Sequence, residues 1–156
     1  MRPDRPPIGP HLARAARAIS RAFDEALTGA GGSLPMWQVL VNLKANPRAS
    51  QREIAEAMGV TEATLTHHLN AMDADGLLTR RRDPDNRRVH IMELTDRGEE
   101  MFLRLRGVAM SFNKRLRRGT TEAEIEQLRT LVDHLVGNVG TVVDDGAPWA
   151  DPIRPR

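Results

Sequence analysis

The chain has 156 residues, of which 40% are hydrophobic and 28% charged, as is typical of one soluble domain with its own core. It has no cysteine and no apolar run near the roughly 18 residues that cross a bilayer, which excludes disulfides, thiolate catalysis, the usual structural zinc sites and a membrane-spanning helix. The net charge is only +2, so bulk charge is weak evidence for an acidic partner and the local distribution of charge is the better guide.

The N-terminal part of the sequence predicts an arm followed by two helices. Residues 1–10 contain four prolines and two arginines, and we expect them to form a mobile arm. Residues 11–29 repeat apolar side chains with a helical period, up to the glycines between 29 and 32. A second helix is predicted to begin at Pro35, whose fixed φ suits a first helical turn, and to close at Asn46-Pro47.

Two short helices separated by a tight turn are predicted next. Ser50 and Glu53 have the spacing of a capping box, and Gly59 is placed to adopt the positive φ of a turn. Thr61 then caps a helix that ends at Gly76. The apolar positions of this second helix fall at i, i+4 and i+7, so one face is predicted to be buried: Leu65, Leu69 and Met72.

A β-hairpin with a basic tip is predicted after these helices. Residues 77–82 and 88–94 alternate in polarity, and the segment DPDN at 83–86 between them is a strong turn signal. Residues 80–88 contain five arginines and two aspartates, a net charge of +3 within nine residues. This local concentration of charge is more informative than the net charge of the chain.

The remainder of the sequence predicts two further helices. A helix of about 23 residues, roughly 34 Å long, is expected from Thr95-Asp96. Its predicted buried stripe is Met101, Leu105, Val108 and Phe112. Gly119 ends it, and a second capping box opens a last helix at Thr121, after which residues 144–156 are expected to be disordered.

The order helix, turn, helix, hairpin is the outline of a winged helix-turn-helix. Opposite its buried stripe, the second helix presents small and hydrogen-bonding groups that suit base edges, with Asn70 a candidate for reading adenine. The amides near Ser50 and Thr61 suit phosphate, and the hairpin arginines suit a minor groove or phosphates. The predicted DNA contacts are Ser50, Gln51, Thr61, Ala63, Thr64, Thr66, His67, Asn70, Arg80, Arg87 and Arg88. The alternatives are an ordinary solvated helix face and a charged edge that protects a two-stranded sheet from aggregation.

From about His11 to Gly140 the chain resembles the MarR family of transcriptional regulators. The resemblance rests on the Ile54-Ala55 helix, the segment DGLLTR at 75–80, and DPDNRR at 83–88 running into LTDRG at 94–98. It implies a mainly α fold with a small β wing (α+β), and a winged helix-turn-helix at about 34–95 within a domain at 11–143. It also implies a homodimer built from helices at about 11–29 and 95–140, which represses from a pseudo-palindromic operator and is often released by a small aromatic or phenolic ligand.

Two positions depart from the family pattern. Asn86 stands where an aspartate usually precedes the wing arginines and orients one of them, so Asp83 or Asp85 is expected to substitute or the wing to be looser. His67 occupies a place in the second helix where arginine is common. We therefore expect either DNA binding that depends on pH or a different contact at this position. The adjacent His68 is expected to be half-buried.

Dimerisation is also expected from the apolar stripes of the first and last long helices, which are too wide for a domain whose winged core is already filled. Pairing these helices across a two-fold axis would bury the surplus and space two reading helices by about one DNA turn, roughly 34 Å.

Other functions are less well supported by the sequence. A ligand site is predicted at His11, Arg14, Met36 and Trp37, with the alternative that Trp37 is a core or interface residue and Arg14 is solvated. The five histidines form no metal-binding pair, and no catalytic motif is present, so we expect no cofactor, no metal and no enzyme. No secretory signal opens the chain, so a cytoplasmic protein that does not bind membranes is expected. A winged-helix module that binds proteins is the alternative function.

Overall fold

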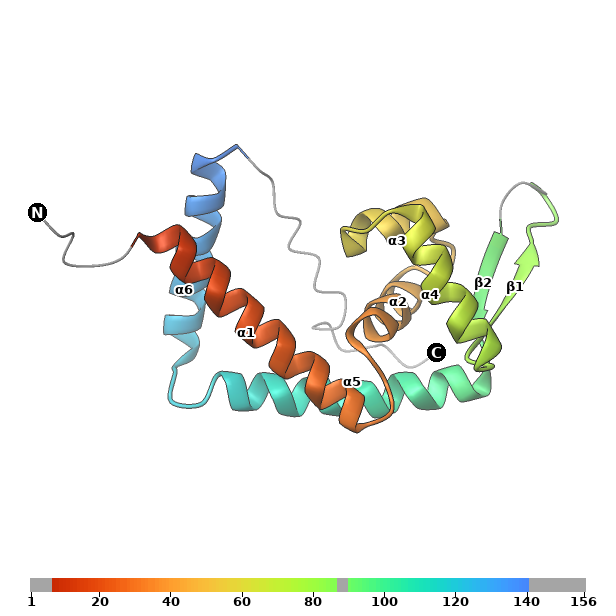
Figure 1. The fold of residues 1–156 in the computed structure, drawn as a ribbon, viewed down its shortest axis with the longest axis horizontal. Helices are drawn as coiled ribbons and strands as arrows, with labels where there is room; N and C mark the ends of the chain where they lie inside the picture. Colours follow the sequence, from red (N-terminus) through yellow and green to blue (C-terminus); the bar gives the residue numbers. More distant parts are fainter. Residues whose placement is uncertain (1–6, 87–89, 141–156) are drawn as a thin grey trace, which may run out of the picture. The chain divides into compact units, whose positions relative to one another are not determined.

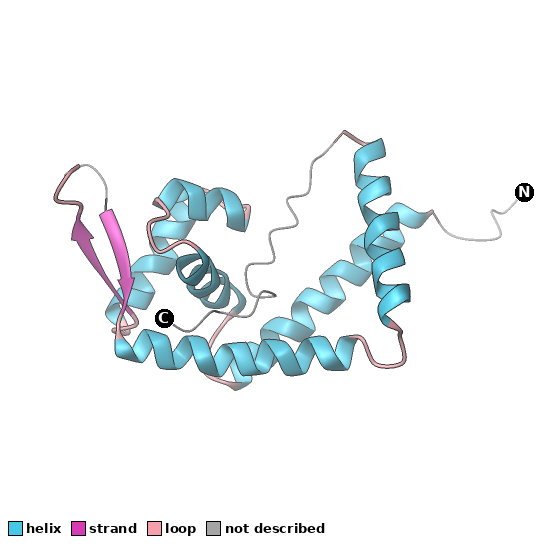
Figure 2. Cartoon of the chain, turned by 180° about the vertical axis from the view of Figure 1, so that it is seen from behind, coloured by secondary structure: helices cyan, strands magenta, loops and turns pink. Residues whose placement is uncertain are grey.

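The computed structural model describes residues 7–86 and 90–140 of the chain. These residues form six helices and one small sheet (Figures 1 and 2). In chain order the elements are α1 (Ile8–Gly29), α2 (Leu34–Ala45), α3 (Gln51–Met58), α4 (Glu62–Ala74), β1 (Leu78–Arg82), β2 (His90–Leu94), α5 (Asp96–Leu116) and α6 (Glu122–Asn138). The prediction of a mainly helical fold with a small β wing is confirmed. The chain divides into two compact units, one up to Ala109 and one from Met110.

Helix α1 begins earlier than predicted. The sequence placed residues 1–10 in an arm, whereas the structure starts the helix at Ile8. Pro10 is the third helical residue, and the first amides of a helix have no partner within the helix, so a proline in the first turn costs no hydrogen bond. The predicted arm is therefore too long by three residues, and residues 1–6 lie outside the described part of the chain.

The connection between α1 and α2 is fixed by hydrogen bonds. The Asp24 carboxylate in α1 accepts from the Leu34 amide at 2.8 Å. The Ser33 hydroxyl accepts from the Met36 amide at 3.2 Å and caps α2, with Pro35 in the first turn as predicted. Two amides that the start of α2 would leave unpaired are thereby satisfied, and one of the two caps comes from the preceding helix.

The first unit contains one hydrophobic core, to which every element from α1 to α5 contributes. Its fully buried side chains are Leu27, Val39, Leu40, Ile54, Leu65, Leu69, Leu77, Leu78, Phe102 and Leu105. The Trp37 ring stacks on Phe102, with ring centroids 5.9 Å apart and planes at 11°. The Lys44 ammonium lies 5.4 Å from the centre of the Phe102 ring and donates to both carboxylate oxygens of Glu99, at 2.9 and 3.1 Å. These contacts join α2 to the first turns of α5.

The buried stripe of α5 is rotated from the predicted one. The sequence predicted Met101, Leu105, Val108 and Phe112, whereas the buried positions are Gly98, Phe102, Leu105 and Ala109. Both sets have the same helical spacing and share Leu105. Contact with the wing selects between them, because a Cβ at Gly98 would lie 1.9 Å from the Leu77 carbonyl oxygen. Only a glycine allows this approach, so the helix is set with Gly98 facing the backbone of Leu77.

The wing is an antiparallel pair of strands with two different faces. Leu78 pairs with Leu94 and Arg80 with Met92, and this face meets the core through Leu78 and Met92. Thr79 pairs with Glu93 and Arg81 with Ile91 on the other face. The base of the hairpin is tied to α5, since the Thr95 amide donates to the Leu77 carbonyl at 3.1 Å and the Thr95 hydroxyl to the Gly76 carbonyl at 2.6 Å.

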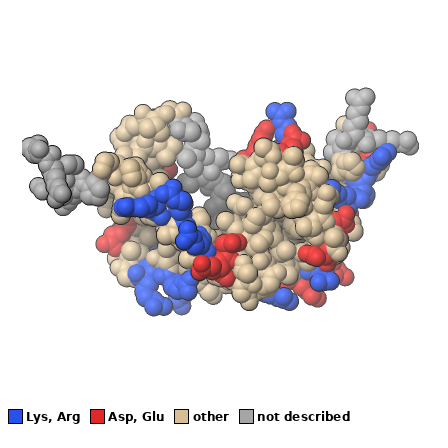
Figure 3. Space-filling model, in the orientation of Figure 1, with Lys and Arg blue, Asp and Glu red and all other residues tan. Residues whose placement is uncertain are grey.

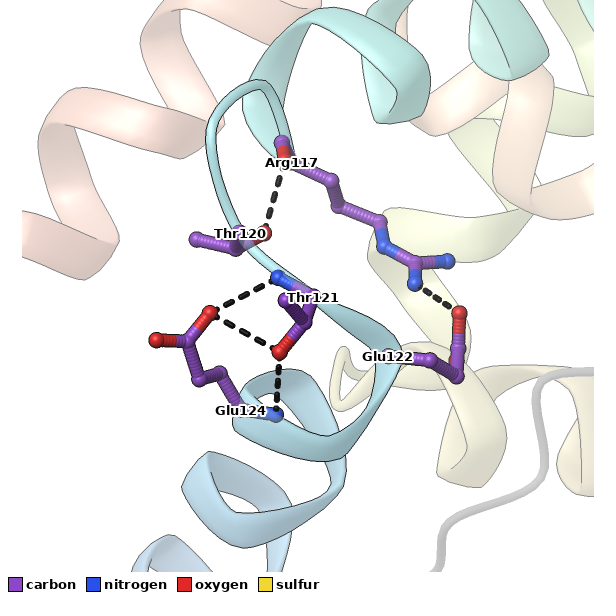
Figure 4. A network of polar contacts seen from close by, with 5 residues as sticks. All are labelled: Arg117, Thr120, Thr121, Glu122 and Glu124. Atoms are coloured by element: carbon purple, nitrogen blue, oxygen red, sulfur yellow. Dashed lines mark hydrogen bonds and ion pairs between the residues drawn. The ribbon is translucent and has the colours of Figure 1, made fainter.

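The second unit contains the last turns of α5 and the whole of α6. The predicted capping box is confirmed: the Thr121 hydroxyl accepts from the Glu124 amide at 3.2 Å, and the Glu124 carboxylate accepts from the Thr121 amide at 2.7 Å (Figure 4). Arg117 forms an ion pair with Glu122 across the same turn. Helix α6 has no buried residue. Its capped start is therefore well defined, but within the described part of the chain its apolar side chains have no core.

Candidate nucleic-acid interface

The first motif helix, α3, begins with the predicted capping box. The Ser50 hydroxyl accepts from the Glu53 amide at 3.2 Å, and the Glu53 carboxylate accepts from the Ser50 amide at 2.7 Å. The hydrogen bond from the Ser50 backbone, followed by that from its hydroxyl, holds the pKa of Glu53 below its ordinary value. Gly59 ends the helix with φ of +66°, as predicted. The chain therefore turns sharply between α3 and α4.

Helix α4 has the two faces that the sequence predicts. Leu65, Leu69 and Met72 are buried in the core. The side chains on the opposite face are exposed: Ala63, Thr64, His67 and Asn70. The Thr61 hydroxyl caps the helix by accepting from the Thr64 amide at 3.1 Å. An α-helix presented in this way can enter a major groove with small side chains that permit close approach.

Two of the predicted DNA contacts are used to join the motif helices. The Thr66 side chain is half-buried, and its hydroxyl donates to the Glu62 carbonyl at 2.8 Å. The same hydroxyl accepts from the Gln51 side-chain amide at 3.3 Å, so α3 and α4 are linked. Sequence reasoning missed this link, although the expected packing of the two helices brings these positions close. Gln51 and Thr66 therefore contribute a hydrogen bond to the packing of α3 against α4.

The two histidines of α4 have different environments. His67 is exposed, and His68 is half-buried as predicted. Their ring centroids lie 5.9 Å apart, with the ring planes at 62°. His67 is therefore the histidine that can face a ligand.

The wing arginines of β1 point to both sides of the sheet. Arg80 donates to the Asn70 side-chain oxygen on α4 at 2.7 Å. Arg81 faces the other way and donates to the Glu93 carboxylate at 2.7 and 3.0 Å, which raises the pKa of Arg81 and lowers that of Glu93. The expected alternation is thus observed, and Arg81 is the arginine turned away from α4. Neither contact was predicted, although the register that places Glu93 diagonally from Arg81 could have suggested the second.

The tip of the wing is described only in part. Asp83 accepts from the Asp85 amide at 2.8 Å, a local hydrogen bond typical of a turn that begins with aspartate. The predicted contacts Arg87 and Arg88 lie outside the described residues. The expectation that Asp83 or Asp85 substitutes for the family's aspartate before Arg87 therefore stays a prediction.

The surface of the motif combines an uncharged helix face with neighbouring positive charge. In Figure 3 the surface around α4, next to α3, is mostly uncharged, charged side chains of both signs lie over α3, and Lys and Arg side chains lie over the wing strands. Helix α4 contacts both α3 and β1. The arrangement can place hydrogen-bonding groups against base edges while the arginines contact the negatively charged backbone.

The four predicted ligand residues are not brought together within one chain. Trp37 is 4% exposed and belongs to the core, and Met36 is half-buried against the same core. His11 and Arg14 are exposed near the start of α1, more than three helical turns from the connection that precedes Met36. Trp37 therefore follows the core alternative. Arg14 is exposed, as the solvated alternative has it.

The described part of the chain offers neither a metal-binding cluster nor a membrane-spanning helix. No three histidines, aspartates or glutamates between residues 7–86 and 90–140 are arranged to hold a metal ion. Among the helices of these same ranges, none combines the length and the apolar character that crossing a membrane requires.

Comparison with known proteins identifies the motif. Residues 33–90 match the model of the MarR family. The transcriptional repressor CouR, bound to a 23-mer DNA duplex, is 27% identical with a TM-score of 0.75, over 83% of this chain and 92% of that one. CouR from Rhodococcus jostii bound to p-coumaroyl-CoA is 22% identical with a TM-score of 0.72, over 88% and 95%. A mutant MarR from E. coli complexed with operator DNA is 18% identical with a TM-score of 0.75, over 83% and 94%.

The last two likenesses establish the fold, and the family model covers the segment from the α2 cap to the start of β2. This segment contains the capped helices, the arginine strand and the turn described above. The chain thus carries a MarR-family winged helix-turn-helix and has the fold of the MarR transcriptional regulators.

Proposed function

We propose that this protein is a transcriptional repressor that binds a pseudo-palindromic operator as a homodimer. The observation that carries the proposal is the exposed, uncharged face of α4 beside the arginines of the wing. The N-terminal turns of α3 and α4 add oriented amides and positive dipole ends that suit phosphate. The solved structure of CouR on a DNA duplex supports the same use of this fold.

The homodimer is supported by the apolar side chains that the chain leaves exposed. In the second unit these are Met110, Leu116, Leu128, Leu131, Leu135 and Val139. Exposed fractions of 54% and 55% for Leu128 and Leu131 are unusual for two leucines on one helix, and a contiguous apolar surface of this kind marks an interaction site. A second copy related by a two-fold axis would cover it and would present two α4 helices to one operator.

An effector is the remaining part of the proposal. CouR binds p-coumaroyl-CoA in one of the matching structures, which supports a small aromatic ligand as the signal that releases this repressor. The exposed Arg14 and His11 of α1 are candidates to contact an acidic ligand if the partner chain completes the site. A thermal-shift screen against phenolic acids and their thioesters tests this part, and an unchanged melting temperature throughout would contradict it.

The salt dependence of DNA binding is the main test. We expect the wild-type chain to bind a duplex carrying the inverted repeat upstream of its own gene, with affinity that falls steeply as salt rises because several phosphates are contacted. Arg87→Ala combined with Arg88→Ala should weaken binding and flatten the salt slope. Arg17→Ala combined with Arg21→Ala removes the same charge from α1 and should change both much less. A complex insensitive to salt would favour the protein-binding alternative.

The dependence on pH tests His67. Because this side chain is exposed on the reading face, and histidine gains positive charge in mildly acidic solution, DNA binding should strengthen as the pH falls. His67→Gln should remove that dependence, and a wild-type affinity unchanged between about pH 5.5 and 8 would assign His67 a different contact.

A further inference from the structure

We propose that Arg80 is a positioning residue that orients the Asn70 amide so that Asn70 donates hydrogen bonds to an acceptor on the DNA. This inference rests on the proposed operator binding. It replaces the expectation that Asn70 reads adenine, and it assigns to the wing strand a direct effect on what the reading helix recognises.

The orientation of Asn70 follows from the chemistry of its partner. A guanidinium group has five N–H donors and no acceptor, so the atom of Asn70 that faces Arg80 at 2.7 Å must be the amide oxygen. The amide nitrogen then lies on the other branch of the side chain, pointing away from Arg80. The oxygen and nitrogen of an asparagine are otherwise hard to distinguish, and here the charged donor decides between them.

Arg80 is held firmly enough to impose this orientation. Its backbone pairs with Met92, which is 2% exposed, and the Arg80 side chain is half-buried between the wing and α4. Its Nε atom is inaccessible to solvent and has no hydrogen-bond partner among the described residues. The Arg80 side chain therefore differs from that of Arg82, which is exposed on the same strand.

The consequence for base recognition is specific. Bidentate recognition of adenine needs the asparagine oxygen to accept from N6 while the nitrogen donates to N7. In this structure Arg80 takes one of the two acceptor positions of the oxygen, and its positive charge disfavours a second donor there, so the two amide hydrogens are the groups best placed to bind DNA. Hydrogen-bond acceptors match them: O6 and N7 of guanine on a base edge, or a phosphate oxygen on the backbone. The adjacent positive charge also polarises the amide and strengthens its N–H groups as donors.

The competing interpretation is that the hydrogen bond between Arg80 and Asn70 only stabilises the packing of α4 against β1 and has no part in DNA recognition. The two interpretations differ in what Asn70→Asp does. An aspartate keeps an oxygen for Arg80, and would strengthen a purely structural contact, but it removes the donors and presents negative charge to an acceptor.

The experiment uses the full-length chain and a random-sequence DNA duplex library. The wild-type chain selects its preferred duplexes, and affinity for the best one is measured for Asn70→Ala, Asn70→Asp, Arg80→Ala and the Arg80→Ala/Asn70→Ala pair. Arg82→Ala is the matched control, because it removes one positive charge from the same strand without touching Asn70. Circular dichroism checks that each variant is folded, and Asn70→Asp, a change at an exposed position, serves if Arg80→Ala does not fold.

We expect Asn70→Ala to weaken binding roughly tenfold and Asn70→Asp to weaken it more. The losses from Arg80→Ala and Asn70→Ala should be non-additive, whereas those from Arg82→Ala and Asn70→Ala should add. The acceptor lies on a base if the wild-type chain prefers guanine at one position, Asn70→Ala abolishes that preference, and Arg80→Ala shifts it toward adenine. A uniform loss without altered base preference locates it on a phosphate.

Three results would overturn the inference while leaving operator binding intact. These are a wild-type preference for adenine at the position that depends on Asn70, wild-type affinity for Asn70→Asp, and additive losses for Arg80→Ala and Asn70→Ala. If the wild-type chain enriches no sequence from the library, operator binding itself is refuted, and this inference falls with it.

Discussion

Helices α3 and α6 begin in the same way but have different surroundings. Each opens with a capping box in which a glutamate accepts from the cap amide at 2.7 Å. Helix α3 then buries Ile54 and Ala55 in the core of the first unit, whereas α6 buries no residue. Caps determine where a helix starts, but most of the free energy that maintains a helix in a protein comes from packing its apolar face. The first unit supplies that packing itself, and we propose that a second copy of the chain supplies it to α6.

The largest expected difference between the two units is in the free energy of unfolding, measured by removing a leucine side chain from each. Leu69→Ala removes a side chain that is 0% exposed, and we expect the free energy of unfolding to fall by about 2–5 kcal/mol, through lost burial and a remaining cavity. Urea denaturation followed by circular dichroism measures the change. Leu131→Ala in α6 removes the same atoms from a side chain that is 55% exposed. Under conditions where the chain is monomeric it should cost less than about 0.5 kcal/mol, and an equal loss for both leucines would contradict the contrast.

A smaller effect distinguishes two glycines of α5. Gly98→Ala would place a Cβ 1.9 Å from the Leu77 carbonyl oxygen, so helix and wing must separate, at a cost of about 1–3 kcal/mol. At Gly107 the added Cβ would meet no atom within 4 Å among the described residues, apart from its chain neighbours and the nearby backbone of α5 itself. Gly107→Ala should therefore stabilise the helix by about 0.5–1 kcal/mol. Thermal unfolding of the two variants should shift in opposite directions, and a shift in the same direction would show that Gly98 does not set the rotation of α5.

The role of the exposed face of α6 in dimerisation is tested by introducing a negative charge there. Leu131→Asp places a carboxylate in the surface that we propose pairs two copies, so the dimer dissociation constant should rise at least roughly tenfold. Sedimentation or light scattering over a range of protein concentrations measures it, and Glu126→Asp is a control that leaves the apolar side chains of the helix unchanged. An unaltered dimer would place the interface elsewhere. A monomeric wild-type chain at micromolar concentration would refute the dimer itself.

The smallest expected effect is the loss of helicity at low pH, which should differ between the capping boxes of α3 and α6. The pKa values of Glu53 and Glu124 are lowered from their ordinary 4.5, in each case first by the hydrogen bond from the cap backbone and then by that from the cap hydroxyl. The stabilisation is thus fully present above about pH 4.5 and is lost as the pH falls through the folded-state pKa. Helicity of the chain should decrease on acidification. Glu124→Gln should reduce that decrease more than Glu53→Gln, because packing in the core maintains α3 without its cap, whereas α6 buries no residue. The reverse order would contradict the contrast.

The features that the sequence predicted correctly are those set by neighbouring residues. Both capping boxes, the positive φ of Gly59 and the buried face of α4 depend on residues within a few positions, whose spacing states the geometry directly. The opening of the wing after Gly76 is equally local, since Gly76 has φ of +70° just after α4 ends. For these elements the physical cause can be read from the chain itself.

The features that were missed depend on contacts between distant residues. Two apolar stripes of equal spacing fit α5, and only the approach of Gly98 to Leu77 selects the observed one. The stacking of Trp37 on Phe102 places a predicted ligand residue in the core, and no local pattern indicates its partner. The bond from Arg80 to Asn70 joins positions ten residues apart on a strand and a helix, so it follows from how the two pack and not from either alone.

Hydrogen bonds connect the base of the hairpin to α5, so the orientation of the wing depends on the first turn of that helix. Thr95 bonds to the backbone of both Gly76 and Leu77, and its hydroxyl also accepts from the Gly98 amide at 3.1 Å, so one residue joins the base of the hairpin to the first turn of α5. Each strand has five residues, a length of about 17 Å. A tilt of about 10° at the start of α5 therefore displaces the far end of the strands by about 3 Å over that length, comparable to the length of a hydrogen bond. A displacement of that size at the far ends of β1 and β2 is enough to make or break a hydrogen bond there.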